Sequence, residues 1–146
     1  MIRAPKAATV AVVDEQHRVL MVWRHRFVID RWVWELPGGY VDEDEDVAIS
    51  AAREVEEETG WRPRSVEAMV SFQPWVGMAD AENLLFLGRG ADYIGDAIDV
   101  NEAERVAWIP IDDVHSHIAS GQIVGAGSII AVLDLLARTQ RGEKLA

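Results

Sequence analysis

The sequence predicts a single layered α/β domain that covers residues 1–146. Its 146 residues, 49% of them hydrophobic and 27% charged, match the length and composition of one globular domain. Segments with strand-like alternation are interspersed with segments that have helical periodicity. No internal repeat, low-complexity stretch or linker-like segment divides the chain. A sheet covered by two or three helices is the arrangement that such a pattern favours.

Three strand-like segments begin the chain. Residues 7–15 (AATVAVVDE) and 18–26 (RVLMVWRHR) are mostly apolar and are separated by a tight turn, which predicts a hairpin. Residues 31–36 (RWVWEL) alternate large apolar side chains and stop at the Pro-Gly-Gly sequence of residues 37–39, which predicts a loop.

Residues 46–59 have the period of an amphipathic helix. Its apolar face consists of Val47, Ala48, Ala51, Ala52 and Val55. Gly60 follows, at the position where a residue in the left-handed conformation ends many helices. A helix that ends at Gly60 is therefore expected.

The second half of the chain continues the alternation of strands and helices. Strands are predicted over residues 66–75, 83–90 and 105–111, with loops over residues 76–82 and 91–104. A short helix capped by Asp112 or Asp113 should run to Ile118, and a closing helix should cover residues 128–139.

Acidic residues are concentrated in one segment. Between Gly39 and Trp61 there are nine acidic residues and one basic residue, so −8 of the net charge of −11 lies there. This argues against a nucleic-acid-binding surface, which needs a basic face, and favours a local site for cations. Glu54, Glu57 and Glu58 share one helix face beside the apolar stripe, and crowded carboxylates suit Mg²⁺ or Mn²⁺. A solvated acidic helix face is the alternative that composition leaves open.

The stretch from Gly39 to Trp61 resembles the signature of the Nudix hydrolases, G-x5-E-x7-R-E-U-x-E-E-x-G-U, where U is an apolar residue. The matching residues are Gly39, Glu45, Arg53, Glu54, Val55, Glu57, Glu58, Gly60 and Trp61. Trp61 departs mildly, because the family usually has an aliphatic residue there. The length of the chain and the order of its elements also fit, so the resemblance covers nearly all of it. It implies an α/β/α sandwich with a mixed sheet.

The resemblance also implies a reaction, the hydrolysis of a nucleoside diphosphate linked to another moiety, with Mg²⁺ or Mn²⁺ as cofactor. Metal ions bound by Glu54, Glu57 and Glu58 would neutralise the diphosphate and activate water for in-line attack. The carbonyl group of Gly38 or Gly39 is expected to complete the coordination of a metal.

Residues around this face are expected to support it. Arg53 can pair with Glu45 or with a helix glutamate and so hold the ligands in place, and Gly60 ends the helix. Nudix enzymes often draw a general base from outside the signature, and Glu102 and Glu104 are the two candidates. Glu102 is slightly favoured because Glu104 lies nearer the following strand, but the sequence does not decide between them.

The stretch before the signature bears on the substrate. It contains VWRHR and then WELPGG, and it resembles ADP-ribose pyrophosphatases, in which arginines precede W-E-L-P-A/G-G. By this resemblance Arg24 and Arg26 meet phosphates or a partner subunit, and Glu35 helps to hold the ligand. Four aromatic residues are near enough to stack on a base, with Trp34 and Phe72 taken as the site candidates: Trp32, Trp34, Phe72 and Trp75. The expected substrate is ADP-ribose or a related nucleotide sugar.

Two other functions stay open at this point. One is hydrolysis of an oxidised nucleoside triphosphate, and the other is non-catalytic nucleotide sensing, against which the complete set of signature carboxylates argues. The expected partner is a small nucleotide, with no nucleic acid and no membrane, and a homodimer is left open. The chain has no cysteine, no signal-peptide-like start and no apolar run near the ~18–20 residues that span a bilayer, which favours a cytoplasmic protein.

Overall fold

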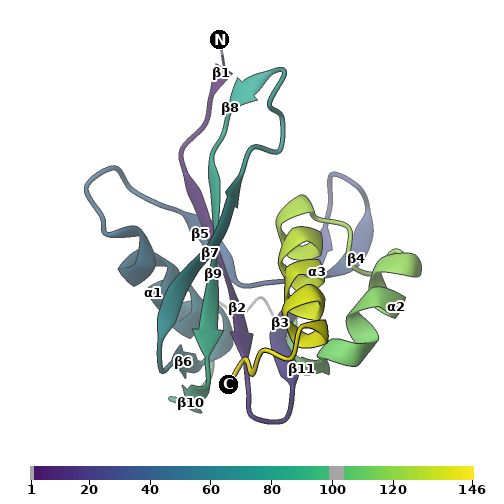
Figure 1. The fold of residues 1–146 in the computed structure, drawn as a ribbon. Helices are drawn as coiled ribbons and strands as arrows, with labels where there is room; N and C mark the ends of the chain where they lie inside the picture. Colours follow the sequence, from purple (N-terminus) through teal and green to yellow (C-terminus); the bar gives the residue numbers. More distant parts are fainter. Residues whose placement is uncertain (1, 99–103) are drawn as a thin grey trace.

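A mixed seven-stranded sheet forms the centre of the computed structural model, which describes residues 2–98 and 104–146 (Figure 1). Five of its strands lie in the order β11, β3, β2, β9, β7; β2 and β9 are parallel, and the other neighbouring pairs are antiparallel. Their bounds are Ala7–Val13 for β2, Arg18–Arg26 for β3, Val66–Phe72 for β7, Asn83–Arg89 for β9 and Arg105–Pro110 for β11. The prediction of a mixed sheet is confirmed.

Strands β2 and β3 separate soon after the turn that joins them. One pair of residues, Val13 and Val19, connects the two strands in register. Beyond this pair, β3 binds β4 (Arg31–Glu35), whereas β2 binds β5 (Gly38–Tyr40). The sheet therefore opens between β2 and β3, and the segment that joins β4 to β5 crosses the opening.

Helices cover both faces of this sheet (Figure 1). α1 (Val47–Thr59) packs on one face, and α2 (Val114–Ala119) and α3 (Ala126–Gln140) lie on the other. The carboxylate of Asp46 accepts a hydrogen bond from the Ile49 N–H at 3.0 Å and caps the start of α1, and Gly60 ends it with φ of 77°. The predicted α/β/α sandwich and the ends of its signature helix are confirmed.

The alternation of the central strands divides the core in two. Val10, Val12 and Leu20 pack with Ala51 and Val55 of α1 in one half. The neighbouring residues along the strands point the other way and pack under α3; among them are Ala11, Val13, Val19 and Met21, together with Leu135. Both layers of helix are thus fixed to the same two strands that border the opening.

Several short strands lie where loops were predicted. Besides β5, they are β8 (Ala79–Asp80), which pairs with β1 (Ile2–Arg3), and β10 (Ala91–Tyr93), which pairs with β6 (Trp61–Pro63). Two or three residues are too few for a pattern of alternation, so their backbone pairing left no signal in the sequence. Asp113, one of the two residues predicted to cap the short helix, occupies the N-cap position of α2, but its side chain makes no capping hydrogen bond.

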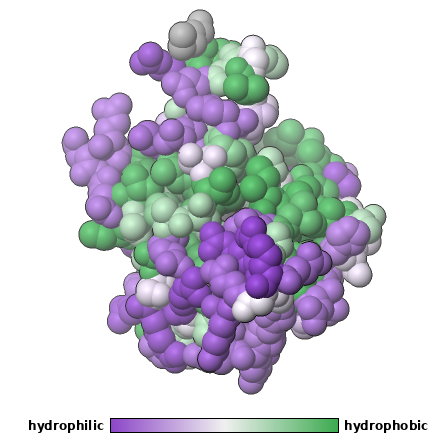
Figure 2. Space-filling model, viewed as in Figure 1, coloured by the Kyte–Doolittle hydropathy of each residue, from purple (hydrophilic) through white to green (hydrophobic). Residues whose placement is uncertain are grey.

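The ladder of β1 and β8 projects from the body of the molecule (Figure 1), and apolar atoms are visible on it and across the middle of the same face (Figure 2). Within residues 2–98 and 104–146, none of the helices combines the length and hydrophobicity needed to cross a bilayer.

Candidate active site

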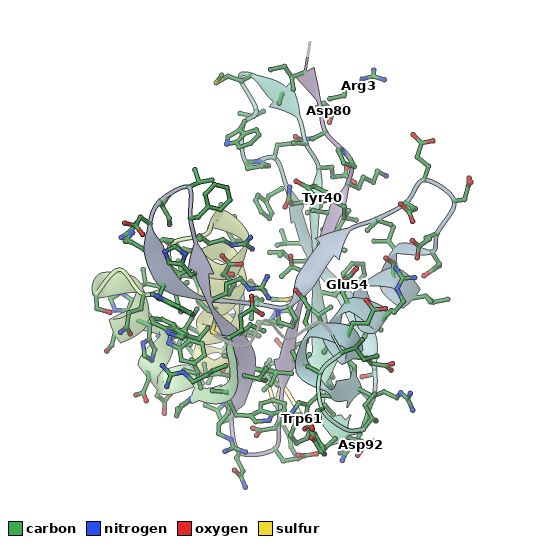
Figure 3. The ribbon with its side chains drawn as sticks, turned by 180° about the vertical axis from the view of Figure 1, so that it is seen from behind. Arg3, Tyr40, Glu54, Trp61, Asp80 and Asp92 are labelled. Atoms are coloured by element: carbon green, nitrogen blue, oxygen red, sulfur yellow. The ribbon has the colours of Figure 1, made fainter. Side chains whose placement is uncertain are left out.

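The acidic face of α1 is directed toward β5. Figure 3 shows Glu54 on this side of the helix, and a Cβ atom added to Gly39 would lie 3.0 Å from the Glu54 carboxyl carbon. One turn further along, Glu58 accepts a hydrogen bond from the Gly38 N–H at 2.7 Å. The structure thus brings Gly38 and Gly39 directly against two glutamates of the signature.

Glu58 is more buried than Glu57, its neighbour on the acidic face of α1. Its side chain is 12% exposed, against 33% for Glu57. Burial raises the pKa of Glu58 above its ordinary value; the Arg24 guanidinium and the Gly38 N–H act in the opposite direction, and Glu104 raises the pKa further. The environment of Glu58 therefore penalises its charge, and Arg24 and Gly38 offset this penalty only in part.

Arg24 is the cation that lies beside Glu58. Its Nη2 donates to Glu58 Oε1 at 3.0 Å, and its Nε and Nη1 lie 3.8 Å and 4.0 Å from carboxylate oxygens of Glu104 and Glu35. The Arg24 side chain is only 15% exposed. One guanidinium group thus links β3 to α1, to β4 and to Glu104, the residue that precedes β11.

Arg26 lies two residues further along the same face of β3 and makes a different contact. It donates to both carboxylate oxygens of Glu35, at 2.7 Å from Nε and 2.5 Å from Nη2. This hydrogen bond raises the pKa of Arg26, and about half of its side chain is exposed. A fork of two parallel bonds holds both groups in one orientation.

Arg53 connects α1 to the acidic loop that precedes it. Its Nη1 donates to Glu45 at 2.6 Å, and its Nε lies 3.7 Å from Glu57. The hydrogen bond from Arg53 lowers the pKa of Glu45 below its ordinary value. Both pairings that the sequence allowed for Arg53 are therefore present, and they orient Glu57 at the edge of the site.

A cavity of about 440 Å³ occupies the opening between β2 and β3. Its lining includes Arg24, Arg26, Glu35, Gly38 and Gly39, all of which are site candidates from the sequence. A second cavity of about 660 Å³ adjoins it, and the two share Arg26, Glu35, Trp75 and Gly125. The tip of the β3–β4 hairpin, including Phe27 and Ile29, lines the second cavity.

The aromatic residues are placed differently from the expectation. Trp34 and Phe72 pack against the core under α3, whereas Trp75 lines both cavities with 61% of its surface exposed. Trp32 stacks on Trp23, with ring centroids 6.3 Å apart. Sequence alone does not separate these tryptophans: Trp32 and Trp34 share one face of β4, Trp75 lies in the turn after β7, and tertiary packing decides which of them stays exposed. Glu102 lies outside the described residues, whereas Glu104 is placed within reach of Arg24.

Comparison with known families adds a further observation. The model of the NUDIX domain matches residues 3–125. The chain belongs to the Nudix family. It is therefore a pyrophosphohydrolase that acts on nucleoside diphosphate derivatives.

Individual Nudix relatives differ in what they hydrolyse. A CMP-5'-(N-acetyl-N-hydroxy-3-aminopropyl)phosphonate hydrolase of Streptomyces rubellomurinus is 47% identical over 97% of this chain and 70% of its own length. An ADP-ribose pyrophosphatase of Mycobacterium tuberculosis is 28% identical over 91% of this chain and 66% of its own length. A crystal structure of an ADP compounds hydrolase superposes with a TM-score of 0.82 at 13% identity, covering 97% of this chain and 75% of the other. That last likeness concerns the fold.

Nudix hydrolases generally use divalent metal ions, and the donor chemistry here fits such an ion. Glu54, Glu57 and Glu58 offer hard carboxylate oxygens on one helix face beside the backbone of β5. Within residues 2–98 and 104–146, however, no three acidic or histidine side chains are gathered closely enough to hold a metal. Glu57 is turned toward Arg53 and Glu58 toward Arg24. The carboxylate oxygens are thus the right type of ligand for a divalent cation. For the three glutamates to bind one ion jointly, the contacts of Glu57 with Arg53 and of Glu58 with Arg24 must change.

Proposed function

We propose that this Nudix enzyme uses Mg²⁺ or Mn²⁺ to hydrolyse the anhydride link between a nucleoside monophosphate and a second, bulky group, as in ADP-ribose or a related nucleotide sugar. The observation that supports this proposal best is the pair of adjoining cavities, which share Arg26, Glu35 and Trp75. An elongated ligand with groups on both sides of its phosphates fits such a space better than a compact one does.

The charges in the first cavity suit the central phosphates of such a ligand. Gly38 and Gly39 line one side and lie against Glu58 and Glu54 of α1, and Arg24 and Arg26 line the cavity from β3. A divalent cation bound by Glu54, Glu57 and Glu58 supplies charge neutralisation and activation of water when present. The arginines bind and orient the phosphate oxygens through charge-assisted hydrogen bonds.

Glu104 is the candidate general base that the described residues support. Its carboxylate lies 3.8 Å from Arg24 Nε, and it is close enough to Glu58 to raise the pKa of that carboxyl. The Arg24 guanidinium lies between Glu104 and Glu58, so a base at Glu104 is close to the proposed metal ligands of α1. Glu102 stays a second candidate, since it lies outside the described residues.

The second cavity is assigned to the group at one end of the substrate. Trp75 and Phe27 offer aromatic surface there, and Trp75 also borders the phosphate cavity. An exposed aromatic ring suits stacking on a nucleobase. Trp75 therefore takes the role first expected of Trp34 and Phe72.

The phosphonate hydrolase relative supports a second candidate substrate of the same class. At 47% identity over nearly the whole chain, it makes a CMP-linked phosphonate a substrate to test on equal terms with ADP-ribose. Homodimer formation also stays a proposal. Exposed apolar side chains on and beside the projecting ladder support it, among them Ile2, Val76 and Met78.

A substrate panel tests the proposal. Purified protein with Mg²⁺ or Mn²⁺ is incubated with ADP-ribose, a CMP-linked phosphonate and an oxidised guanosine triphosphate, and the nucleotide products are separated by chromatography. We expect release of a nucleoside monophosphate from one of the first two, and its loss in excess EDTA. Preference for the triphosphate, with kcat/KM in the range of about 10⁴–10⁸ M⁻¹s⁻¹ usual for native substrates, contradicts the substrate class. Undiminished activity in EDTA contradicts the proposed dependence on a divalent metal ion.

A further inference from the structure

Arg24 is placed unusually for an arginine that is expected to bind substrate. It is largely buried among the carboxylates of Glu58, Glu104 and Glu35, and its Nε atom has no hydrogen-bond partner within the described residues. Arg26 already neutralises Glu35 through two hydrogen bonds. The charge of Arg24 is thus directed mainly at Glu58 and Glu104.

Both oxygens of Glu58 are already engaged. Oε2 accepts from the Gly38 N–H at 2.7 Å, and Oε1 accepts from Arg24 at 3.0 Å. A carboxylate has lone pairs for further contacts, but a guanidinium and a divalent cation on the same oxygen repel each other strongly in a partly buried site. The backbone donor is neutral and fixed by β5, so Arg24 is the partner that can leave.

The charge balance favours such an exchange. Burying Glu58 and Glu104 without a cation is costly, because burial penalises isolated charge. Arg24 offsets part of that cost with one positive charge shared between two carboxylates, and a divalent cation brings two. Arg24 also lines the cavity beside β5, so a guanidinium released from Glu58 stays in the site.

We propose that Arg24 is an exchangeable counter-ion: it holds Glu58 and Glu104 until a divalent cation takes its place, and it then turns toward the phosphates of the substrate. The inference rests on the proposed metal site on α1. It makes metal binding and substrate binding reinforce each other, because the ion that completes the site also frees a cation for the ligand.

Arg26 provides a matched control for Arg24. It lies on the same strand face, carries the same charge and lines the same cavity, but its hydrogen bonds go to Glu35 and not to Glu58. Replacing either arginine with glutamine changes the local charge equally. Only the change at Arg24 releases Glu58.

Calorimetric titration with Mn²⁺, without substrate, separates the two effects. We expect Arg24→Gln to tighten Mn²⁺ binding by at least about tenfold, because a competing charge has gone, and Arg26→Gln to change it much less. If Mn²⁺ binding tightens equally in both variants, the exchange is overturned, and the loss of one positive charge near the site explains the result. Unchanged or weaker binding in Arg24→Gln overturns it as well.

A second measurement uses the unmodified chain and does not depend on the folding of a variant. In protein labelled with ¹⁵N-arginine, the Nε–H resonance of Arg24 should move on titration with Mg²⁺, and that of Arg62, which pairs with Glu56 away from the cavities, should not. A stationary Arg24 resonance during Mg²⁺ binding overturns the exchange alone. If wild-type protein binds no divalent cation, or if Glu57→Gln and Glu58→Gln leave its affinity unchanged, the proposed metal site itself fails.

Discussion

The backbone N–H of Gly38 lies 2.7 Å from Oε2 of Glu58 and joins the start of β5 to the last turn of α1. This bond fixes Glu58, a largely buried glutamate of the signature, against the opened part of the sheet. It depends on a close approach of β5 to β2, because a Cβ atom on Gly38 would lie 2.3 Å from the Ala8 carbonyl oxygen. The glycine is therefore required by backbone contact at the site.

Gly38→Ala should lower both stability and activity. The added methyl group meets backbone, which cannot turn aside as a side chain does, so β5 must move away from β2. We expect a loss of about 1–3 kcal/mol in the free energy of unfolding, the usual cost of overpacking, measured by urea denaturation. Gly77→Ala is the control, since nothing lies within 4 Å of its added Cβ atom. Equal stability of the two variants contradicts the account.

Glu57→Gln and Glu58→Gln should each lower kcat/KM by about 10²-fold or more, because each removes a charge from the metal-binding face. Glu56→Gln should have little effect. Glu56 lies off that face, where it accepts a hydrogen bond from Arg62 at 2.6 Å. Steady-state kinetics at saturating Mg²⁺ measure the difference. A loss at Glu56 as large as that at Glu57 would mean that the face has been assigned wrongly.

Neutralising Glu58 should stabilise the protein in a chelating buffer at neutral pH. Burial raises the folded-state pKa of Glu58, so the folded state binds its proton more tightly than the unfolded state does. The stabilisation that comes from binding this proton is complete below the pKa of Glu58 in the unfolded state. It is lost as the pH rises through the pKa of Glu58 in the folded state. Glu58→Gln should therefore melt at a higher temperature than wild type at pH 7, and the gain should vanish below about pH 4. Thermal unfolding in EDTA across this range, with Glu56→Gln as control, measures it; a lower melting temperature at pH 7 contradicts it.

Arg26→Ala and Trp75→Ala should mainly raise KM for the nucleotide substrate. Both residues line the two cavities and lie apart from the α1 carboxylates, so each should bind the substrate in the ground state as well as in the transition state. An increase of about tenfold is expected when one charge-assisted hydrogen bond at Arg26 is removed. Arg62→Ala is the control for removal of a surface arginine. A fall in kcat without a change in KM would place these residues in the chemical step instead.

Local signals explain what the sequence predicted well. The spacing of apolar residues, the cap at Asp46 and the left-handed Gly60 all lie within one segment, so the helix and its acidic face follow from that segment's own residues. The pairing of Arg53 with Glu45, eight residues away, is almost as local.

Contacts between distant segments explain what the sequence left out. Arg24 and Glu58 are 34 residues apart, and their pairing follows from how α1 packs against the sheet. The same reason separates Trp34 from Trp75. Trp34 packs against the core cluster under α3, whereas Trp75 lies in the turn that follows β7, and the residues next to each tryptophan in the sequence do not encode this difference.

The separation of β2 from β3 has a consequence for how this enzyme can diversify. The arginines of the site lie on β3, which contributes Val19, Leu20 and Met21 to the two halves of the core, and Gly38 lies on β5 against the backbone of β2, so the strands that carry the chemistry are fixed by the core of the fold. The tip of the β3–β4 hairpin and the segment around Trp75 border the second cavity but carry little of that core. Substitutions can accumulate there at low cost in stability. The residues of the reaction can therefore stay constant on the core strands while substrate preference changes through the segments that border the second cavity.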